Sequence, residues 1–300
     1  MSRLPPLPVR DGLGPARVRV QGGLLVDEFQ RRWGSGAKVV AGEVFCADGT
    51  VADETTVLPA GAVVYLYRDL PDEVPVPFDV PILFRNDDIV VVDKPHFLAT
   101  MPRGRHVVET ALVRLRRDLA LPELSPAHRL DRLTAGVLLF TTRREIRGAY
   151  QSMFARGEVT KTYLAHSSVK TERDFPVTVR SRIVKRRGHL QAVEVAGEPN
   201  AETFVEQLDD GRYRLSPRTG RTHQLRLHMS GLGVPITGDP LYPAVVDVDP
   251  ADFSTPLALL AQLLEFEDPV SGVHRRFTSE RQVGEKQCAP RSRLPSVDHA

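Results

Sequence analysis

The sequence predicts an α+β protein: a main domain with a mixed, largely antiparallel β-sheet and flanking helices, preceded by a small α+β N-terminal domain. Three observations support this class. Short β-prone runs follow one another closely between residues 160 and 216, which is typical of hairpins. Helical patterns alternate with strands elsewhere in the chain. A proline-rich segment at 71–81 separates the two parts.

The composition is that of an ordinary folded protein. The chain has 300 residues, 41% of them apolar, and a chain of this size buries most of the surface that its unfolded form exposes. No apolar run approaches the roughly 18 residues that cross a bilayer, and no secretory leader pattern is found. The two cysteines, Cys46 and Cys288, lie far apart, as is typical of a reducing compartment. We therefore expect a cytoplasmic protein.

The N-terminal part is predicted to contain a flexible arm and a small module. Residues 1–15 are rich in proline and glycine and show no periodicity. The module at 16–70 has a helical pattern at Leu24–Trp33. Two β-prone runs follow at Glu43–Cys46 and Ala62–Tyr67, which makes this module α+β.

A proline-rich linker at 71–81 precedes the main domain, which we place at 82–289, and a flexible tail at 290–300 ends the chain. The expected strands are Ile89–Val92, Gly136–Phe140, Thr160–Ala165, Pro176–Val184, Gly188–Val195, Thr203–Gln207 and Tyr213–Ser216. The expected helices are His106–Leu119, Arg143–Gly157 and Thr222–Gly231. The sequence shows no internal repeat of the kind that forms a solenoid or a propeller.

Positive charge is concentrated in two segments, although the net charge is only +2. The first segment contains Arg103, Arg105, Arg114, Arg116 and Arg117, and the second contains Arg180, Arg182, Lys185, Arg186 and Arg187. Local basic patches, rather than net charge, determine where a phosphate backbone binds. Such runs are also common on ordinary solvated faces, so both interpretations remain open.

A polar loop at 128–136 carries one carboxylate, Asp131, between Arg129 and Arg132, and it precedes an apolar strand. A carboxylate beside guanidinium groups stays ionised, which suits a nucleophile or a stabiliser of positive charge better than a general acid. An ion pair that fastens the loop would use the same residues. The loop alone therefore leaves catalysis and structure both open.

A second polar segment, 218–228, follows the last expected strand. Gly220 supplies a turn, and Thr222 is the expected N-cap of the helix that follows. The helix then has a core-facing stripe formed by Leu225, Met229 and Leu232.

The start of this helix has the chemistry of an anion site. Its free N–H groups, with Arg221 and Arg226 nearby, could hold a carboxylate such as Asp131, a phosphate, or both. His223 and His228 are five positions apart and point to different faces, so they form a poor pair of metal ligands. We expect no metal.

Five motifs follow one another in order between about residues 82 and 280. They are Val-Asp-Lys-Pro at 92–95, His-Arg-Leu-Asp-Arg-Leu-Thr-Ala-Gly at 128–136, Lys-Thr-Tyr at 161–163, Gly-Arg-Thr-His-Gln-Leu-Arg at 220–226 and Gly-Asp-Pro-Leu-Tyr at 238–242. Together they resemble the ordered motifs of the RluA family of pseudouridine synthases. Several unrelated spacings must agree at once, which makes this resemblance specific.

The resemblance implies a pseudouridine-synthase catalytic domain in which Asp131 is the catalytic aspartate, Tyr163 contacts the uracil face and Arg226 pairs with Asp131. It also implies that Arg129 enters the RNA stack in place of the flipped base. The expected RNA contacts are Arg129, His128, Arg132, Lys161, Arg221, His223 and Lys94. The module at 16–70 is similar to a small RNA-binding module that precedes the catalytic domain in many of these enzymes.

Isomerising uridine requires breaking the C1′–N1 bond, turning the base and forming a C1′–C5 bond. No redox change or group donor is involved, which agrees with the absence of glycine-rich nucleotide-binding motifs, so no cofactor is expected. The target base must leave the stack, and an arginine can take its place. The expected partner is structured ribosomal or transfer RNA, bound by a monomer, with no membrane and no nucleotide cofactor. Asp131 could attack C1′, attack C6 or assist loss of the C2′ proton.

Four positions, in three of the motifs or segments, depart from the family pattern. Ala135 stands where serine is usual, His96 and Phe97 replace alanine and glycine, and Val234 replaces histidine. None of them removes an acid, a base or a charge partner, so they bear on which RNA is bound.

Two other functions remain open. One is a non-catalytic RNA-binding or ribosome-assembly protein on the same fold. The other is a hydrolase that uses Asp131, with His128, on a nucleoside or a glycoside; such enzymes usually need two carboxylates. Release of free uracil would favour the hydrolase over the isomerase.

Overall fold

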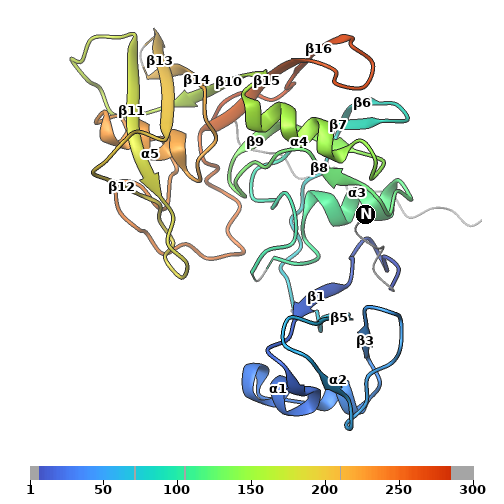
Figure 1. Ribbon diagram of the computed structural model, residues 1–300. Helices are drawn as coiled ribbons and strands as arrows, with labels where there is room; N and C mark the ends of the chain where they lie inside the picture. Colours follow the sequence, from blue (N-terminus) through green and yellow to red (C-terminus); the bar gives the residue numbers. More distant parts are fainter. Residues whose placement is uncertain (1–6, 71, 105, 210, 285–300) are drawn as a thin grey trace, which may run out of the picture. The chain divides into compact units, whose positions relative to one another are not determined.

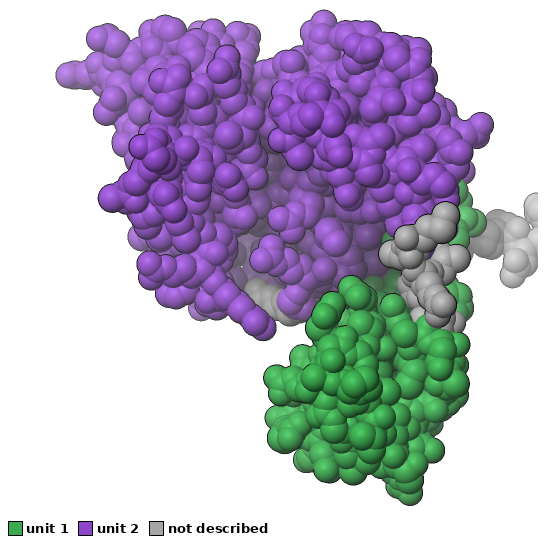
Figure 2. Space-filling view, viewed as in Figure 1, with its two compact units in different colours: residues 1–72, 116–122 green, residues 73–115, 123–300 purple. Residues whose placement is uncertain are grey.

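The computed structural model describes residues 7–70, 72–104, 106–209 and 211–284. The chain divides into two compact units (Figure 2). Unit 1 comprises residues 1–72 and 116–122, and unit 2 comprises residues 73–115 and 123–300. No helix in the described ranges is both long and apolar enough to cross a membrane.

Unit 1 contains two small antiparallel ladders and two helices. Three strands pair in the order β1-β5-β3, and β2 pairs with β4. The bounds are β1 (Ala16–Arg19), β2 (Gly23–Leu24), α1 (Leu25–Trp33), α2 (Ala37–Val40), β3 (Val44–Cys46), β4 (Val57–Leu58) and β5 (Val63–Leu66). Leu25 and Phe29 of α1 pack against Val64 of β5 in the apolar core of this unit.

The described part of the expected flexible arm, residues 7–15, makes defined contacts. Arg10 and Leu13 form an isolated bridge, and the Arg10 guanidinium lies 4.2 Å from the centre of the Tyr67 ring. The Tyr67 hydroxyl donates a hydrogen bond to the Pro8 carbonyl at 2.7 Å. Residues 1–6 of the arm and the expected tail at 290–300 lie outside the described residues.

Unit 2 is built on one long mixed sheet (Figure 1), which confirms the predicted α+β class. Its strand order is β12-β11-β13-β14-β10-β15-β9-β7-β6, with β16 paired to β15 and β8 to β9. The β15–β9 pair is parallel, and the other pairs are antiparallel.

The strands of unit 2 are β6 (Ile82–Arg85), β7 (Ile89–Lys94), β8 (Ser125–Pro126), β9 (Ala135–Thr141), β10 (Val159–His166), β11 (Val177–Val184), β12 (Val193–Val195), β13 (Ala201–Asp209), β14 (Arg212–Pro217), β15 (Leu259–Glu267) and β16 (His274–Thr278). Its helices are α4 (Arg147–Arg156) and α5 (Gln224–Gly231), and the helix α3 (Ala111–Asp118) belongs to unit 2 up to residue 115.

Two apolar clusters flank the centre of the sheet, and strand β10 takes part in both. Val159 packs in the cluster that contains α4, and Ala165 packs in the cluster that contains α5. Figure 1 shows α4 beside β7 and β9, and α5 beside β11 and β13. Lys161 and Tyr163 lie between Val159 and Ala165 on β10, and Tyr163 packs against the cluster that contains α5.

Residues 73–81, expected to be a linker, belong to unit 2 instead. The Glu73 carboxylate accepts hydrogen bonds from the backbone N–H groups of residues 107–109, at 2.7 to 3.0 Å. Val76 and Phe78 are buried. Prolines keep this segment extended, but its apolar side chains find buried positions, so it does not act as a spacer.

The same contact explains why helix α3 is shorter than expected. The sequence predicts a helix from His106, but α3 begins only at Ala111. The N–H groups of residues 107–109 point to the Glu73 carboxylate, and the Thr110 hydroxyl then accepts the Val113 N–H at 3.2 Å as an N-cap.

Candidate active site

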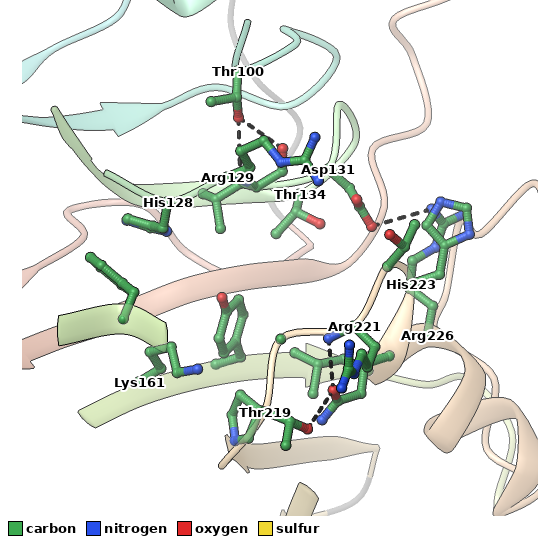
Figure 3. Close-up of a pocket in the computed structure, with 18 of the residues that line it drawn as sticks. Thr100, His128, Arg129, Asp131, Thr134, Lys161, Thr219, Arg221, His223 and Arg226 are labelled. Atoms are coloured by element: carbon green, nitrogen blue, oxygen red, sulfur yellow. Dashed lines mark hydrogen bonds and ion pairs between the residues drawn. The ribbon is translucent and has the colours of Figure 1, made fainter. Parts of the chain in front are cut away.

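A cavity of about 750 Å³ opens on unit 2 between the two clusters (Figure 3). It is lined mainly by residues from four segments, 99–106, 127–134, 154–163 and 217–226. These segments comprise two loops, the end of α4 with the strand β10 that follows it, and the turn that leads into α5. The residues expected at the site that line it are Asp131, Tyr163, Arg226, Arg129, His128, Arg132, Lys161, Arg221 and His223.

The loop that carries Asp131 is held through its main chain. The Thr100 hydroxyl donates to the carbonyl of residue 130 at 2.8 Å and accepts the N–H of the same residue at 3.1 Å. Lys94 Nζ donates to the carbonyl of residue 132 at 3.3 Å, and His96 Nδ1 donates to that of residue 133 at 2.6 Å. These four bonds fix the backbone on both sides of Asp131 and leave its side chain in the cavity.

Lys94, expected to contact RNA, does not line the cavity. It ends the fully buried strand β7 and has no exposed surface. Its amine also donates to the carbonyls of Pro95 and Leu98, both at 2.8 Å. Burial lowers the pKa of the Lys94 amine well below its ordinary value. The expected RNA contact is therefore wrong, and Lys94 instead holds the main chain of the Asp131 loop.

Gly136 allows the loop to end close to the centre of the sheet. Its backbone has a φ of +113°, and a Cβ atom there would lie 2.2 Å from the Ala261 carbonyl oxygen. Only glycine fits this conformation and this approach. Strand β9 can thus pair in parallel with β15, which in turn pairs with β10, and Asp131 reaches the cavity that Tyr163 also lines.

Arg226 of α5 lines the cavity, and only 3% of its side chain is exposed. Its Nη1 atom is 3.9 Å from Asp131 Oδ2, so the expected pair is present as a long contact (Figure 3). A closer partner, Asp239, accepts from Arg226 Nε at 2.8 Å and also from its Nη2. Burial alone would lower the pKa of Arg226, but the hydrogen bonds and charge of Asp239, with Asp131, raise it overall.

Asp239 is a residue of this site to which the sequence analysis gave no role. Its side chain is fully buried, and its Oδ1 atom accepts the N–H groups of Leu241 and Tyr242 at 2.8 and 3.2 Å. Gly238 before it has a φ of +75°, and a Cβ atom there would lie 2.4 Å from the Pro256 carbonyl. The sequence signal that could have indicated Asp239 is the Gly-Asp-Pro-Leu-Tyr motif at 238–242, but a motif does not show which residue its aspartate contacts.

Tyr163 and Lys161 form part of the cavity wall on β10. Burial, and then the charge of Asp131, raises the pKa of the Tyr163 hydroxyl, which therefore stays protonated. Burial lowers the pKa of the Lys161 amine. Figure 3 shows the Lys161 amine directed into the cavity, on the opposite side from Asp131.

His128 lines the cavity as a neutral ring. Its Nε2 atom accepts the Leu139 N–H at 3.2 Å, and its ring stacks on Phe154 with centres 4.5 Å apart. Burial lowers the pKa of His128 to about 3. A ring that is neutral and bonded to the main chain acts as a wall and carries no positive charge for a phosphate.

His223 occupies the turn before α5 in a left-handed conformation, with a φ of +60°. It is the N-cap position, and the expected N-cap Thr222 is therefore wrong. The turn is closed instead by the Gln224 side-chain oxygen, which accepts from the Thr219 hydroxyl at 2.7 Å and the Arg221 N–H at 3.0 Å. The expected apolar stripe of the helix is confirmed, because Leu225, Met229 and Leu232 are buried.

The His223 ring has a defined orientation. The Tyr242 hydroxyl donates to the Ala192 carbonyl at 2.9 Å and accepts the Ala192 N–H at 2.8 Å. His223 Nδ1 lies 3.0 Å from this hydroxyl and must donate to it, since the hydroxyl proton is already used. Burial lowers the pKa of His223, against the charge of Asp131, so Nε2 is left as an acceptor.

The charge of the cavity wall is strongly unequal. Among the described residues that line it, Asp131 is the single carboxylate and eight are arginine or lysine. The basic residues are Arg103, Arg129, Arg132, Arg156, Lys161, Arg218, Arg221 and Arg226. In the part of the chain that the structure describes, no group of three His, Cys, Asp or Glu side chains could hold a metal ion.

The two basic segments of the sequence do not form single patches at this cavity. Arg103 lines it, whereas Arg114 turns inward and donates to the carbonyls of Val76 and Phe78. Arg105 lies outside the described residues. The second segment, 180–187, belongs to β11 and the turn after it and is not part of the cavity wall.

Comparison with known proteins finds similarity over these same residues. The sequence profile of the family described as RNA pseudouridylate synthase matches residues 88–231. "Pseudouridylate synthase RPUSD2" of Homo sapiens is 35% identical over 174 residues, which is 55% of this chain and 31% of that protein. The chain therefore spans about a third of the length of this relative.

Two further matches cover most of the matched protein. "tRNA pseudouridine synthase C" of Haemophilus ducreyi is 32% identical over 185 residues, covering 55% of this chain and 74% of that protein. Among solved structures, "Human RNA Pseudouridylate Synthase Domain Containing 1" has a TM-score of 0.52 at 24% identity and covers 70% of this chain and 86% of its own. At that identity the structural match shows the fold alone.

Proposed function

This chain belongs to the RNA pseudouridylate synthase family, of the RluA type, and from that premise we propose that it isomerises uridine in structured RNA to pseudouridine. The observation that carries the proposal is the wall of the cavity. A single carboxylate, Asp131, lies among eight basic side chains. Such a wall attracts a polyanion and offers it one reactive acid.

The reaction needs little more than this. The C1′–N1 bond breaks, the uracil turns within the cavity, C5 bonds to C1′, and the C5 proton is lost while N1 gains one. Asp131 supplies the negative charge, by attack on C1′, by attack on C6 or by assisting loss of the C2′ proton. Arg226, whose Nη1 atom lies 3.9 Å from Asp131 Oδ2, places a positive charge beside that carboxylate. The ring of Tyr163, whose hydroxyl stays protonated, offers a face on which the uracil can stack.

The target uridine must leave the RNA stack before it can enter a cavity of this kind, and unstacking costs a few kcal/mol. Arg129 is exposed at the cavity, and no partner is found for its guanidinium among the described residues. A planar cation that is free to move can fill the space of the extruded base and keep its neighbours stacked. We therefore assign this role to Arg129.

The substrate class is proposed as transfer or ribosomal RNA. The Haemophilus ducreyi relative is named as a tRNA enzyme, and the basic wall suits any folded RNA. We also propose that the chain acts as a monomer and without a nucleotide cofactor. The cytoplasmic location expected from the cysteine usage stays a prediction.

A hydrolase is the alternative that the cavity tests most directly. Glycosidases usually place two carboxylates on either side of the scissile bond. Asp239, the nearest other acid to Arg226, is fully buried and does not line the cavity. With one carboxylate in its wall, the cavity favours an isomerase, which keeps the uracil, over a hydrolase, which releases it.

The test compares RNA from cells with and without this chain. We expect pseudouridine at one or a few uridines to disappear when the chain is removed, and purified protein to release tritium from RNA that carries 5-tritiated uridine. Chromatography of the same reaction should show no free uracil. Unchanged pseudouridine maps together with no tritium release would contradict the proposal, and free uracil would support the hydrolase.

A further inference from the structure

We propose that Phe97 is a positioning residue, whose backbone carbonyl orients the Arg132 guanidinium toward a phosphate of the bound RNA. This inference rests on the proposed function, because it assumes that RNA enters the cavity that Arg132 lines. It gives a binding role to a residue that is buried and does not itself line the cavity.

One hydrogen bond links the two residues. Arg132 Nη1 donates to the Phe97 carbonyl oxygen at 3.3 Å. A guanidinium group is planar and its N–H groups point in fixed directions, so an acceptor at one nitrogen limits how the rest of the group can turn. The position of the Phe97 carbonyl therefore helps to set where the charge of Arg132 lies in the cavity.

The direction of the Phe97 carbonyl depends on a left-handed backbone, with a φ of +66°. The carbonyls of Pro95 and Leu98 accept the buried Lys94 amine, both at 2.8 Å. The carbonyl of Phe97 instead accepts the arginine of the cavity wall. A right-handed or extended backbone at residue 97 would turn the peptide that contains this carbonyl and take it away from Arg132.

Aromatic packing holds Phe97 in this conformation. Its ring centre lies 6.2 Å from that of Phe78 and 5.4 Å from that of Phe253, and these two are 6.0 Å apart. A left-handed backbone is disfavoured for a residue with a side chain, so it persists only where the surrounding contacts outweigh the strain. The buried ring of Phe97 thus keeps its carbonyl in place.

The test compares Phe97→Ala with Phe97→Gly. Both remove the ring, but only glycine adopts a left-handed backbone without strain. Affinity per folded molecule is measured with unfractionated transfer RNA at low salt, so the result does not depend on turnover. We expect Phe97→Ala to bind about tenfold more weakly than the wild type and Phe97→Gly only about threefold more weakly. A ring that only packs would give equal losses or the reverse order, because alanine keeps more of the packing.

The salt dependence of binding shows whether a phosphate contact has been lost. Each such contact contributes about 0.7 to 0.9 to the slope of log Kd against log salt. We expect Arg132→Ala and Phe97→Ala each to lower the slope by this amount, and Phe97→Gly to lower it less. In the Arg132→Ala background, Phe97→Ala should change the affinity by less than about twofold, because the group that it positions is absent.

Phe277→Ala is the matched control. Phe277 of β16 also belongs to a group of three aromatic rings, with centres 5.4 Å from Phe84 and 6.2 Å from Phe266. It does not line the cavity. We expect this variant to have a lower melting temperature, with the RNA affinity and the salt slope of the folded protein unchanged.

The inference is overturned if Phe97→Ala and Phe97→Gly bind RNA equally well, or if Phe97→Ala leaves the salt slope unchanged. It is also overturned if Phe97→Ala weakens binding as much in the Arg132→Ala background as in the wild type. Absence of tritium release from a wild type that shows this coupling would instead refute the proposed isomerisation, and the binding role of Phe97 would stand.

Discussion

Asp131→Asn is the substitution for which the structure separates catalysis from stability most clearly. The change removes one negative charge and keeps the size of the side chain. If Asp131 reacts with the ribose or the base, tritium release should fall at least about a thousandfold, on the order of 4 kcal/mol of lost transition-state stabilisation. If it only fastens the loop, the loss should appear in stability.

The stability cost follows from the contacts. At 3.9 Å the Asp131–Arg226 attraction is about 1 kcal/mol in a water-like medium and about 4 kcal/mol at an effective dielectric constant of 20. Because 34% of the Asp131 side chain is exposed, the lower value applies. Arg226 also keeps Asp239, so no buried charge is left unpaired. A loss of about 1 kcal/mol lowers the melting temperature by about 2–4 °C in a domain of this size.

The assay measures tritium release from RNA that carries 5-tritiated uridine, beside thermal melting and RNA binding on the same preparations. Asp209→Asn is the control, since Asp209 pairs with Arg212 at the surface away from the cavity. It should resemble Asp131→Asn in stability and the wild type in activity. A folded Asp131→Asn protein that releases tritium at close to the wild-type rate would refute the reasoning.

The other predictions concern the replacement of the flipped base by Arg129, the need for metal ions, the first residues of unit 2 and the pH dependence of stability. Arg129→Ala should reduce turnover of a folded stem-loop far more than its binding, because its side chain is expected to enter the stack; equal losses would count against this role. Activity should survive EDTA, and a chelator-sensitive rate restored by a divalent ion, with RNA folding controlled, would contradict that. A 73–300 fragment should be soluble and keep reduced activity. In this fragment, Glu73→Ala should lower the free energy of unfolding by on the order of 2 kcal/mol, because the N–H groups of residues 107–109 lose their acceptor. An unchanged denaturation midpoint would show that these hydrogen bonds contribute nothing. Burial lowers the pKa of His96 from an ordinary 6.5 to about 4, so the unfolded chain binds the proton more readily than the folded chain. The contribution of His96 to the free energy of unfolding should therefore be full above pH 6.5 and fall by on the order of 3 kcal/mol as the pH drops to about 4. His96→Ala should flatten that slope in denaturant titrations, and an unaltered slope would rule out this histidine as its source.

The resemblance carried by the ordered motifs implies that Asp131, Tyr163 and Arg226 meet, and the structure brings all three to the wall of one cavity. The sequence does not predict burial of a charge. Lys94 ends an apolar run and has the character of a basic residue available to RNA, but β7 lies between β9 and β6 and all of its residues are buried. The partner of Arg226 is equally invisible, since Asp239 approaches it only after the chain has folded.

Strand β15 shows a second limit of the sequence. It lies beside β10 and β9 in the centre of the sheet, yet the run at 259–267 consists mostly of leucine, alanine, glutamine and glutamate. These residues favour helices and show no strict alternation. The pairing is irregular where Thr162 and Tyr163 oppose Leu263 and Ala261. Neighbouring strands on both sides, rather than local preference, make this segment extended.

Phe97 illustrates how a departure from a family pattern is accommodated. It takes a left-handed backbone, with a φ of +66°, at a position where glycine is usual. Such a conformation costs about 1–2 kcal/mol for a residue with a side chain. The Phe97 ring packs against Phe78 and Phe253, which come from distant segments, and it is 5% exposed. Burial of the ring offsets the strain, and no local signal in the sequence indicates this.

The main-chain attachment of the Asp131 loop has a consequence for how such a protein can change over evolutionary time. Thr100, Lys94 and His96 bond carbonyl and amide groups, which every amino acid possesses, so the identity of residue 129 does not decide where the loop lies. Arg132 differs, because its guanidinium also donates to the Phe97 carbonyl at 3.3 Å. The side chain at 129 can therefore change while the reactive carboxylate keeps its place. A library randomised at 129 should accordingly yield mostly folded variants that bind RNA and turn it over slowly, whereas randomising 94, 96 and 100 should yield few that hold Asp131 in place.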